Sequence, residues 1–450
     1  MSEFLYHYNP VDPATWFYLS SLLMIGLFFK FGRVWSVRNL DLVLLILLAP
    51  GLLFIHYGSE MVLKDDSSVQ SSVRGEADAA NVTVDSESTT DEANDQSATA
   101  KRAQRYGYYW QFGIGLIWLI RMLADPLMVR RPLLEPNLTG GGLTFIGCSL
   151  FVFLMANVIN KSPEPEATMA VSNSAEEAGA PKTPQAGPGY RHFVNLPIGA
   201  RKMLSITAHL AVVASMVLIG YRHFDNIVMG VGAATLYLML PYTSVMTNRV
   251  QHVLPAALIV SALLCYRRPL AAGTLLGLAG GLAYYPLFLL PLWLSFYWSR
   301  GLYRFLTSYG LTLVVLTTAL LISSTDHFGD FCWMYGFRWP AMEGLGGIWS
   351  PDLGGWSPFY RLPVIAAFAV LAIGLAIWPA QKNFGSLLSC TSAVMIGTQF
   401  WHGFGGGTFI AWYIPMLLLT TFRPNLEDRV ALSVIPKSPF EKKREPAIAA

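Results

Sequence analysis

The chain has 450 residues, of which 53% are hydrophobic and 13% charged, with a mean hydropathy of +0.43 and a net charge of +3. A soluble protein carries about 25% charged residues, so this composition excludes a water-soluble enzyme and a wholly disordered chain. The small net charge argues against nucleic-acid binding. Continuous runs rich in Leu and Ala, without period-two alternation, argue against a β-barrel. The sequence therefore predicts an all-α protein, a polytopic bundle of transmembrane helices.

The apolar runs can be assigned to individual spans. A transmembrane helix needs about 20 apolar residues, and fewer where flanking groups reach the interface. On that basis the chain has about thirteen candidate spans, at 15–30, 41–56, 107–124, 143–159, 203–220, 227–243, 253–266, 271–285, 286–298, 309–324, 361–378, 385–401 and 408–421. Pro286 separates two of them, which leaves open one kinked helix or two broken ones.

Polar segments divide the spans into groups. The predicted organisation is N-terminal spans at 1–56, an external acidic loop at 57–106, spans at 107–160, an external Pro/Glu/Ala-rich loop at 161–202, a main bundle at 203–421 with an external Trp-rich loop at 323–360, and a tail at 422–450. The acidic loop and the Pro/Glu/Ala-rich loop carry too little apolar surface to offset chain entropy, so we expect both to be disordered.

The distribution of Lys and Arg predicts the orientation. With the N-terminus outside, pairs such as Arg130-Arg131 and Arg267-Arg268 fall in the cytoplasm, and the short outer connections contain only Arg249. Cytoplasmic connections carry an excess of basic residues. The protein is therefore expected to be a multi-pass protein of the plasma or inner membrane, with its C-terminus in the cytoplasm and the lipid bilayer as a partner.

One stretch of the main bundle resembles a known family. A span ending in Pro241-Tyr242 and a short polar connection are followed by RRPLAAGTLLGLAGG at 267–281 and YYPLFLLPL at 284–292. This stretch, 236–305, resembles the GT-C class of polyprenyl-phosphate-sugar-dependent glycosyltransferases. The resemblance implies a GT-C-like bundle and hexosyl or mannosyl transfer at the external membrane face. The partners it implies are a polyprenyl-phosphate-linked sugar donor and a glycan or lipid acceptor.

The resemblance also implies a site. Members use a carboxylate in an early external loop as the base, and the carboxylates nearest the membrane in the first large external loop are Glu60, Asp65 and Asp66. The candidate substrate-binding residues, which carry charge, hydrogen-bonding capacity or aromatic faces, are Arg249, His252, Tyr284, Tyr285, Asp326, Arg338 and Trp339. No cofactor and no metal is expected, because Asp326, His327 and Asp330 do not complete a ligand set.

Several residues leave alternatives open. Family members carry a basic residue where this chain has Ala283, which keeps a non-catalytic relative or scaffold as an alternative. A transporter would need mid-span charges and internal repeats, and neither is evident. The Trp-rich loop fits either a glycan surface or an interfacial aromatic belt. His402 either faces an external cavity or caps a turn, and His209 needs a partner if it lies within the membrane. Glycines spaced by four at 273, 277 and 281 predict close helix packing.

Overall fold

A computed structural model describes residues 11–61, 86–128, 134–160, 196–323, 327–337, 345–380 and 382–424 of the protein. These residues form helices, turns and connections, and contain no strand. The expectation of an all-α protein is confirmed for this part of the chain.

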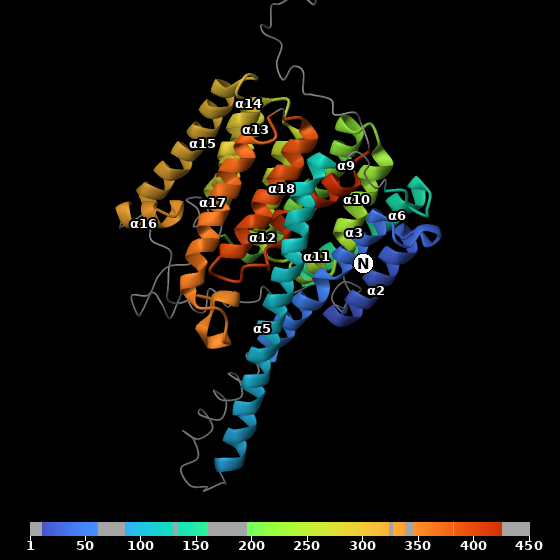
Figure 1. Ribbon diagram of the computed structural model, residues 1–450, viewed down its shortest axis with the longest axis vertical. Coiled ribbons are helices and arrows are strands. Elements are labelled where there is room, and N and C mark those ends of the chain that lie inside the picture. The colour runs from blue at the N-terminus through green and yellow to red at the C-terminus, as the bar shows by residue number, and fades with distance from the viewer. Residues whose placement is uncertain are drawn as a thin grey trace, which may run out of the picture.

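The first half of the chain folds into long helices that lie side by side (Figure 1). They are α2 (Pro13–Phe28), η1 (Phe31–Arg33), α3 (Val37–Ile46), α5 (Ser86–Ala124), η2 (Asp125–Leu127), α6 (Gly140–Asn160), α9 (Ile198–His223), α10 (Ile227–Met239), α11 (Pro241–Val245) and α12 (Val250–Leu264). After a turn at Leu47 the helical run that begins with α3 continues to Met61.

The second half completes the bundle with α13 (Pro269–Leu282), η3 (Tyr285–Leu289), α14 (Leu290–Tyr297), α15 (Leu302–Ser323), α16 (His327–Tyr335), η4 (Gly347–Trp349), η5 (Pro351–Leu353), η6 (Pro358–Tyr360), α17 (Arg361–Ile377), α18 (Phe384–Trp401), η7 (Ile410–Trp412) and α19 (Ile414–Phe422). Helix α18 is buried on all sides over most of its length. A helix that is apolar all round belongs in the middle of a bundle, and α18 lies between α5 and α17 in Figure 1.

Local sequence explains where several helices begin. The Asp12 carboxylate accepts the backbone N–H groups of Ala14 and Thr15 at the start of α2. Asn226 caps α10 in the same way, by accepting from the amide of Met229. Asn383 and Ser386 form a reciprocal capping box at the start of α18. Each cap satisfies amides that have no partner within the helix.

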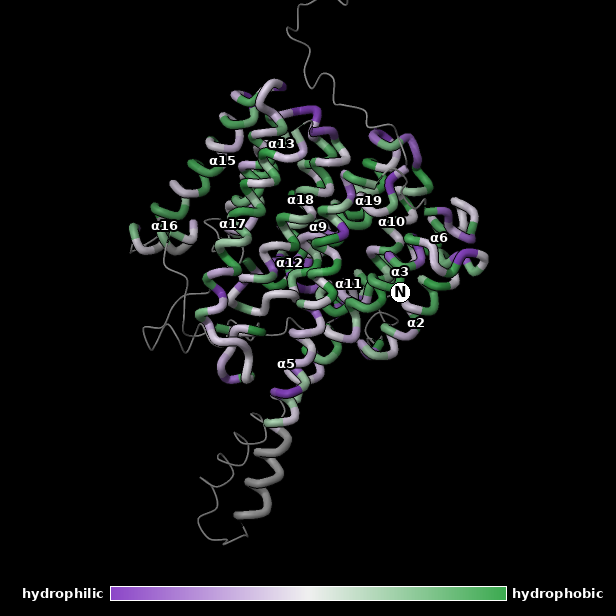
Figure 2. The backbone as a smooth tube through the Cα atoms, in the orientation of Figure 1, coloured by the Kyte–Doolittle hydropathy of each residue, from purple (hydrophilic) through white to green (hydrophobic). Residues whose placement is uncertain are grey.

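The apolar character of the helices indicates a membrane environment. Five helices of the described residues are long and apolar enough to cross a membrane, namely Val37–Met61, Gly140–Asn160, Ile198–His223, Leu302–Ile322 and Pro358–Ile377. Five more are apolar but shorter, at Pro13–Phe28, Ile227–Met239, Val250–Leu264, Pro269–Leu282 and Tyr285–Tyr297. Figure 2 shows hydrophobic residues along most of the bundled helices, with hydrophilic stretches at turns and where α5 leaves the bundle.

Every predicted span overlaps a helix, and the structure resolves the ambiguity at Pro286. Helix α13 ends at Leu282, Ala283 is extended, and a separate 3-10 turn and helix follow from Tyr285 to Tyr297. The chain therefore forms two broken pieces there, because Pro286 cannot continue an α-helix from the preceding turn.

Two segments predicted as loops are partly helical. Residues 57–61 end the second helix, and 86–106 belong to α5, which extends beyond the bundle (Figure 1). This part of α5 is rich in Ala, Glu, Gln, Lys and Arg, which have high helix propensity. Within 323–360, α16 and three 3-10 turns form. Low apolar content thus argued against a packed core but not against a helix.

The glycine ladder of α13 packs against α15, as predicted. A Cβ atom on Gly273 or Gly281 would collide with Ser308 or Leu316, and one on Gly277 would lie 3.1 Å from the Tyr309 carbonyl oxygen. The two backbones can approach this closely only because these positions lack side chains.

The bundle has two ends, which serve as landmarks below. The loop end carries residues 345–360 and the turn 402–408, which are joined by a hydrogen bond from the Gly346 amide to the Gly403 carbonyl. The tail end carries Arg423 and the turns 223–226 and 265–268, where His223 Nε2 donates to the Leu264 carbonyl at 2.9 Å.

Candidate functional site

Four of the predicted substrate-binding residues gather at the loop end. Tyr284 and Tyr285 lie between α13 and α14, while Arg249 and His252 start α12. The turn that follows α18 brings His402 and Phe409 between these two groups. The chain therefore assembles one cluster from three separate segments.

Five rings of this cluster form a continuous stack, which we call the ring stack. The ring centroids are 4.1 Å apart for Tyr284–Tyr285, 4.6 Å for Tyr285–His402, 4.6 Å for His402–Phe409 and 4.3 Å for Phe409–His252. The Trp412 ring flanks Tyr285 at 5.3 Å. All five rings are buried, so the stack is a rigid aromatic wall.

Hydrogen bonds fix the two imidazoles of the stack. The Tyr242 hydroxyl lies 2.8 Å from His252 Nδ1. His402 Nδ1 accepts the backbone N–H of Phe404 at 3.1 Å, so His402 caps the turn and faces the cluster at once. Burial, together with the nearby Arg361 charge, lowers the pKa of His402 to about 3. The ring is therefore neutral near pH 7, and its buried Nε2 has no hydrogen-bond partner in the described structure.

Two arginines flank the ring stack. The buried Arg361, at the start of α17, donates from Nε to the Trp401 carbonyl at 2.7 Å and interacts electrostatically with Tyr284 and Tyr285. Arg249 precedes the first turn of α12 and interacts electrostatically with His252 and Tyr108. The site thus places cations on both sides of an aromatic wall, an arrangement that suits an anionic ligand with apolar faces.

A second imidazole, His209 of α9, is paired beside this site. Its Nε2 donates to the Thr247 carbonyl at 3.2 Å, and its Nδ1 lies 3.0 Å from the Tyr237 hydroxyl. Both ring nitrogens therefore have partners, which removes the cost of burying the ring. These contacts hold α9 to the connection that follows α11.

Glu60 is the one predicted base among the described residues. It lies at the loop end, in the last turn of its helix, and its carboxylate is 3.3 Å from His56 Nε2. Its side chain is 52% exposed, so it can meet a substrate from solvent. Of the other predicted site residues, Asp65, Asp66, Asp326, Arg338 and Trp339 lie outside the described residues.

The Trp-rich segment folds onto the bundle. Trp349 is fully buried, donates from Nε1 to the Phe400 carbonyl, and contacts Phe112 of α5 edge to face at 6.3 Å. Trp356, which is 44% exposed, contacts Phe112 and Tyr109. Trp349 is thus a core residue, whereas Trp356 retains an accessible face. His327, of the triad considered for metal binding, is exposed, and the part of the chain that the structure describes has no group of three metal-ligating side chains.

The tail end buries a network of charges that local sequence did not reveal. Arg121 of α5 pairs with Asp41 at 3.3 Å and approaches Asp125 at 3.9 Å, and Arg423 donates to Asp125 at 2.8 Å. Each of these side chains is at most 11% exposed. This charge network joins α3, α5 and the end of α19, which are far apart in sequence.

The sequence singled out Arg249, His252, Tyr284 and Tyr285 but missed the residues that connect them. Arg361 and Phe409 carried no local signal, and His402 stood in a glycine-rich turn whose direction only the fold determines. Comparison of the chain with protein-family models, with curated proteins and with solved structures found no match.

Proposed function

We propose that the protein is a multi-pass membrane glycosyltransferase that uses a polyprenyl-phosphate sugar as donor at its loop end. The observation that supports this proposal is the convergence of Arg249, His252, Tyr284 and Tyr285 around His402 and Phe409. These four residues come from the stretch that resembles the GT-C class. Their meeting in one cluster is what a shared site requires.

The donor chemistry explains why cations and rings belong together. When the acceptor hydroxyl attacks the anomeric carbon, the bond from that carbon to the phosphate oxygen breaks, and polyprenyl phosphate leaves with the negative charge. Cationic groups stabilise the leaving phosphate, a role for Arg249, for Arg361 and, by the sequence analysis, for Arg338. Aromatic side chains at the edge of the site, such as Trp356, offer an apolar face to a sugar ring.

The acceptor hydroxyl needs a base. Glu60 is the candidate with a described position, and Asp65 and Asp66 follow it in sequence. His56 beside Glu60 orients the carboxylate. A positioned base contributes typically 10²–10⁴-fold to such a reaction, so its loss is measurable.

The proposal includes an orientation. About thirteen spans with the N-terminus outside place the loop end at the external face and the tail end in the cytoplasm. The cytoplasmic turns then hold Arg222, Arg267, Arg268 and Arg300, in line with the positive-inside rule.

Sugar transfer by the purified full chain tests the proposal. Radiolabelled polyprenyl-phosphate hexoses would be supplied in vesicles, and transfer measured for the wild type and for Glu60→Gln, Asp65→Asn and Asp66→Asn. We expect one carboxylate variant to lose about 10²–10⁴-fold and Arg249→Gln to lose transfer as well. Glu135→Gln, which changes an exposed carboxylate outside the cluster, is the matched control.

The outcomes separate class from site. Normal transfer by all three carboxylate variants rejects the assigned base but keeps the class. No transfer by the wild type from any polyprenyl-phosphate hexose, with intact folding, favours the non-catalytic alternative. That alternative draws on one observation, that the rings of the stack are already packed against one another, and on Ala283 where the family carries a basic residue.

A further inference from the structure

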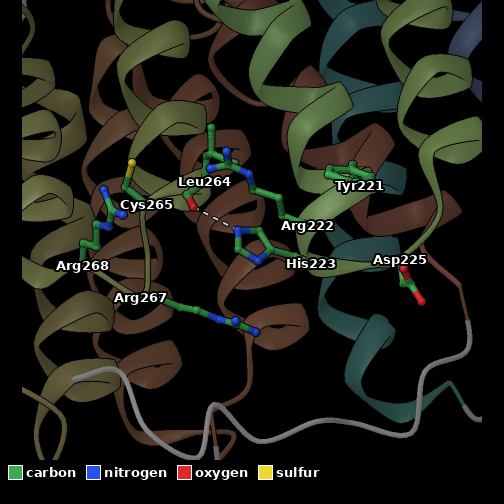
Figure 3. A pocket seen from close by; sticks show the side chains of 8 residues that line it. All are labelled: Tyr221, Arg222, His223, Asp225, Leu264, Cys265, Arg267 and Arg268. Atoms are coloured by element: carbon green, nitrogen blue, oxygen red, sulfur yellow. Dashed lines mark hydrogen bonds between the residues drawn. The ribbon is translucent and has the colours of Figure 1, made fainter. Parts of the chain in front are cut away.

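A cavity of about 530 Å³ lies at the tail end, away from the ring stack. The turn between α9 and α10 and the turn between α12 and α13 form its walls (Figure 3). We call it the basic pocket, and its lining residues are Tyr221, Arg222, His223, Asp225, Leu264, Cys265, Arg267 and Arg268. The volume falls within the range of about 300–1,000 Å³ that is usual for small-molecule sites.

The lining carries an excess of positive charge. Three arginines face one carboxylate, that of Asp225, and in Figure 3 Asp225 lies on the opposite side of the pocket from Arg268. Within the described residues, neither Arg222 nor Arg268 has an ion-pair partner. Unpaired guanidinium groups around one cavity attract an anion, and their planar donors suit phosphate.

His223 adds a donor or acceptor fixed in place. Its Nε2 donates to the Leu264 carbonyl (dashed line in Figure 3), and its ring contacts Tyr266 and Phe384 at 4.8 and 5.0 Å. The other ring nitrogen, Nδ1, is buried and has no hydrogen-bond partner in the described structure. A buried polar atom without a partner is costly, and a ligand oxygen with a proton to share would satisfy it.

The surroundings indicate where the anion comes from. Apolar side chains stand exposed next to the pocket, including Tyr221 at 59%, Ile227 at 52% and Leu270 at 55%. Exposed apolar side chains at the ends of membrane helices contact lipid chains. Basic pockets between transmembrane helices on the cytoplasmic side bind lipid head groups.

We infer that the basic pocket binds the phosphate head group of an anionic membrane lipid, with Arg222, Arg267 and Arg268 as its cationic contacts. The lipid tails lie along the exposed apolar side chains of α9, α10 and α13. This site is separate from the proposed transferase site, and its occupancy does not depend on sugar transfer.

Lipid binding by the full chain in detergent tests the inference. The probes are short-chain phosphatidic acid, short-chain phosphatidylcholine and inorganic phosphate, and the readout is the affinity derived from the shift in melting temperature. We expect phosphatidic acid to stabilise the wild type and phosphatidylcholine to have no effect. In the triple variant Arg222→Gln, Arg267→Gln, Arg268→Gln we expect affinity to fall at least about tenfold, because each charge-assisted hydrogen bond contributes about 1.5–3 kcal/mol.

Matched controls separate the pocket from general charge. Arg304 is exposed at the start of α15 and lines no part of the pocket, so Arg304→Gln should bind as the wild type does, whereas Arg268→Gln should bind more weakly. Equal affinity for the triple variant and the wild type would overturn the inference. Equal stabilisation by inorganic phosphate and phosphatidic acid would overturn the assignment to a lipid.

A second measurement needs no variant. Cys265 lines the pocket, whereas Cys148 is exposed on α6. Phosphatidic acid should slow alkylation of Cys265 in the wild type at least about threefold, in line with partial occupancy near the dissociation constant, and leave Cys148 unchanged. Equal rates for Cys265 with phosphatidic acid and with phosphatidylcholine would contradict the site even if the triple variant fails to fold.

Discussion

The two ends of the bundle bury polar groups in different ways. The loop end buries imidazoles and phenols that are neutral and stacked, as in Tyr285–His402. The tail end buries full charges, as in Arg423–Asp125. A buried ion pair is costly to break, because the remaining charge is left without a partner, whereas a neutral ring tolerates the loss of one hydrogen bond. We therefore expect the tail end to govern stability and the loop end to have latitude for function.

Breaking the charge network should have the largest effect. Asp125→Asn leaves Arg423 and Arg121 with less compensation in a buried site, and we expect the free energy of unfolding to fall by about 3–5 kcal/mol. Unfolding of the full chain in mixed micelles measures it. Glu135→Gln removes a carboxylate that is 66% exposed and should change stability by less than about 1 kcal/mol. Similar losses for the two variants would contradict the comparison.

A glycine next to the same network gives a second test. A Cβ atom on Gly385 of α18 would overlap the Arg423 guanidinium, so Gly385→Ala must displace that side chain. We expect a loss of about 1–3 kcal/mol, as for other overpacked sites. Gly374 of α17 has open space around its Cβ position, and Gly374→Ala should instead stabilise the helix by up to about 1 kcal/mol. Opposite signs for these two chemically identical changes are the expected result.

The loop end should respond to acid through His402. Because burial lowers the pKa of His402 to about 3 and the unfolded value is about 6.5, the unfolded chain binds more protons between these pH values. Stability is therefore fully present above about pH 6.5 and is lost as the pH falls toward 3. Between pH 7.5 and 5.5 this group should remove about 1.4 kcal/mol.

The His402→Phe variant isolates that contribution. It keeps an aromatic ring between Tyr285 and Phe409 but cannot bind a proton. Its unfolding free energy should decrease by about 1.4 kcal/mol less than that of the wild type over the same pH interval. An identical pH dependence for both proteins would show that His402 is not held neutral by burial.

The smallest effect is expected for a single neutral hydrogen bond in the ring stack. Tyr242→Phe removes the hydroxyl that contacts His252 Nδ1, and we expect a loss of about 1 kcal/mol. Tyr360, which is 65% exposed, serves as the control, since Tyr360→Phe should have no measurable effect. A loss as large as that of Asp125→Asn would mean that the two ends do not differ as proposed.

Local pattern predicted those features that depend on neighbouring residues. Apolar runs located the helices because burying an apolar stretch requires its backbone to be hydrogen-bonded internally. Pro286 predicted an interruption, because proline removes a donor and clashes with the preceding turn. The spacing of Gly273, Gly277 and Gly281 predicted a close helix contact, although not that its partner would be α15.

The composition of a segment was a weaker guide to its structure. The first turns of α5 are polar and charged, and such residues were expected to remain without regular structure. Helix formation there needs only favourable local propensity and continuity with the apolar part of α5 from Gly107 onward. Similarly, the Trp-rich segment fitted either a sugar surface or an interfacial belt, and the fold buried Trp349 against Phe112 instead.

The sequence by itself determined the helical class, the position of most helices, and a group of four residues that belong to one cluster. Only the tertiary structure decided that His402, Phe409 and Arg361 complete this cluster and that Asp41, Arg121, Asp125 and Arg423 form a network. The physical reason is that periodicity and propensity act over a few residues, whereas these contacts join segments that become neighbours only when the helices pack. A polar side chain in an apolar run is a cost that the sequence shows, and the partner that offsets it is fixed by the fold.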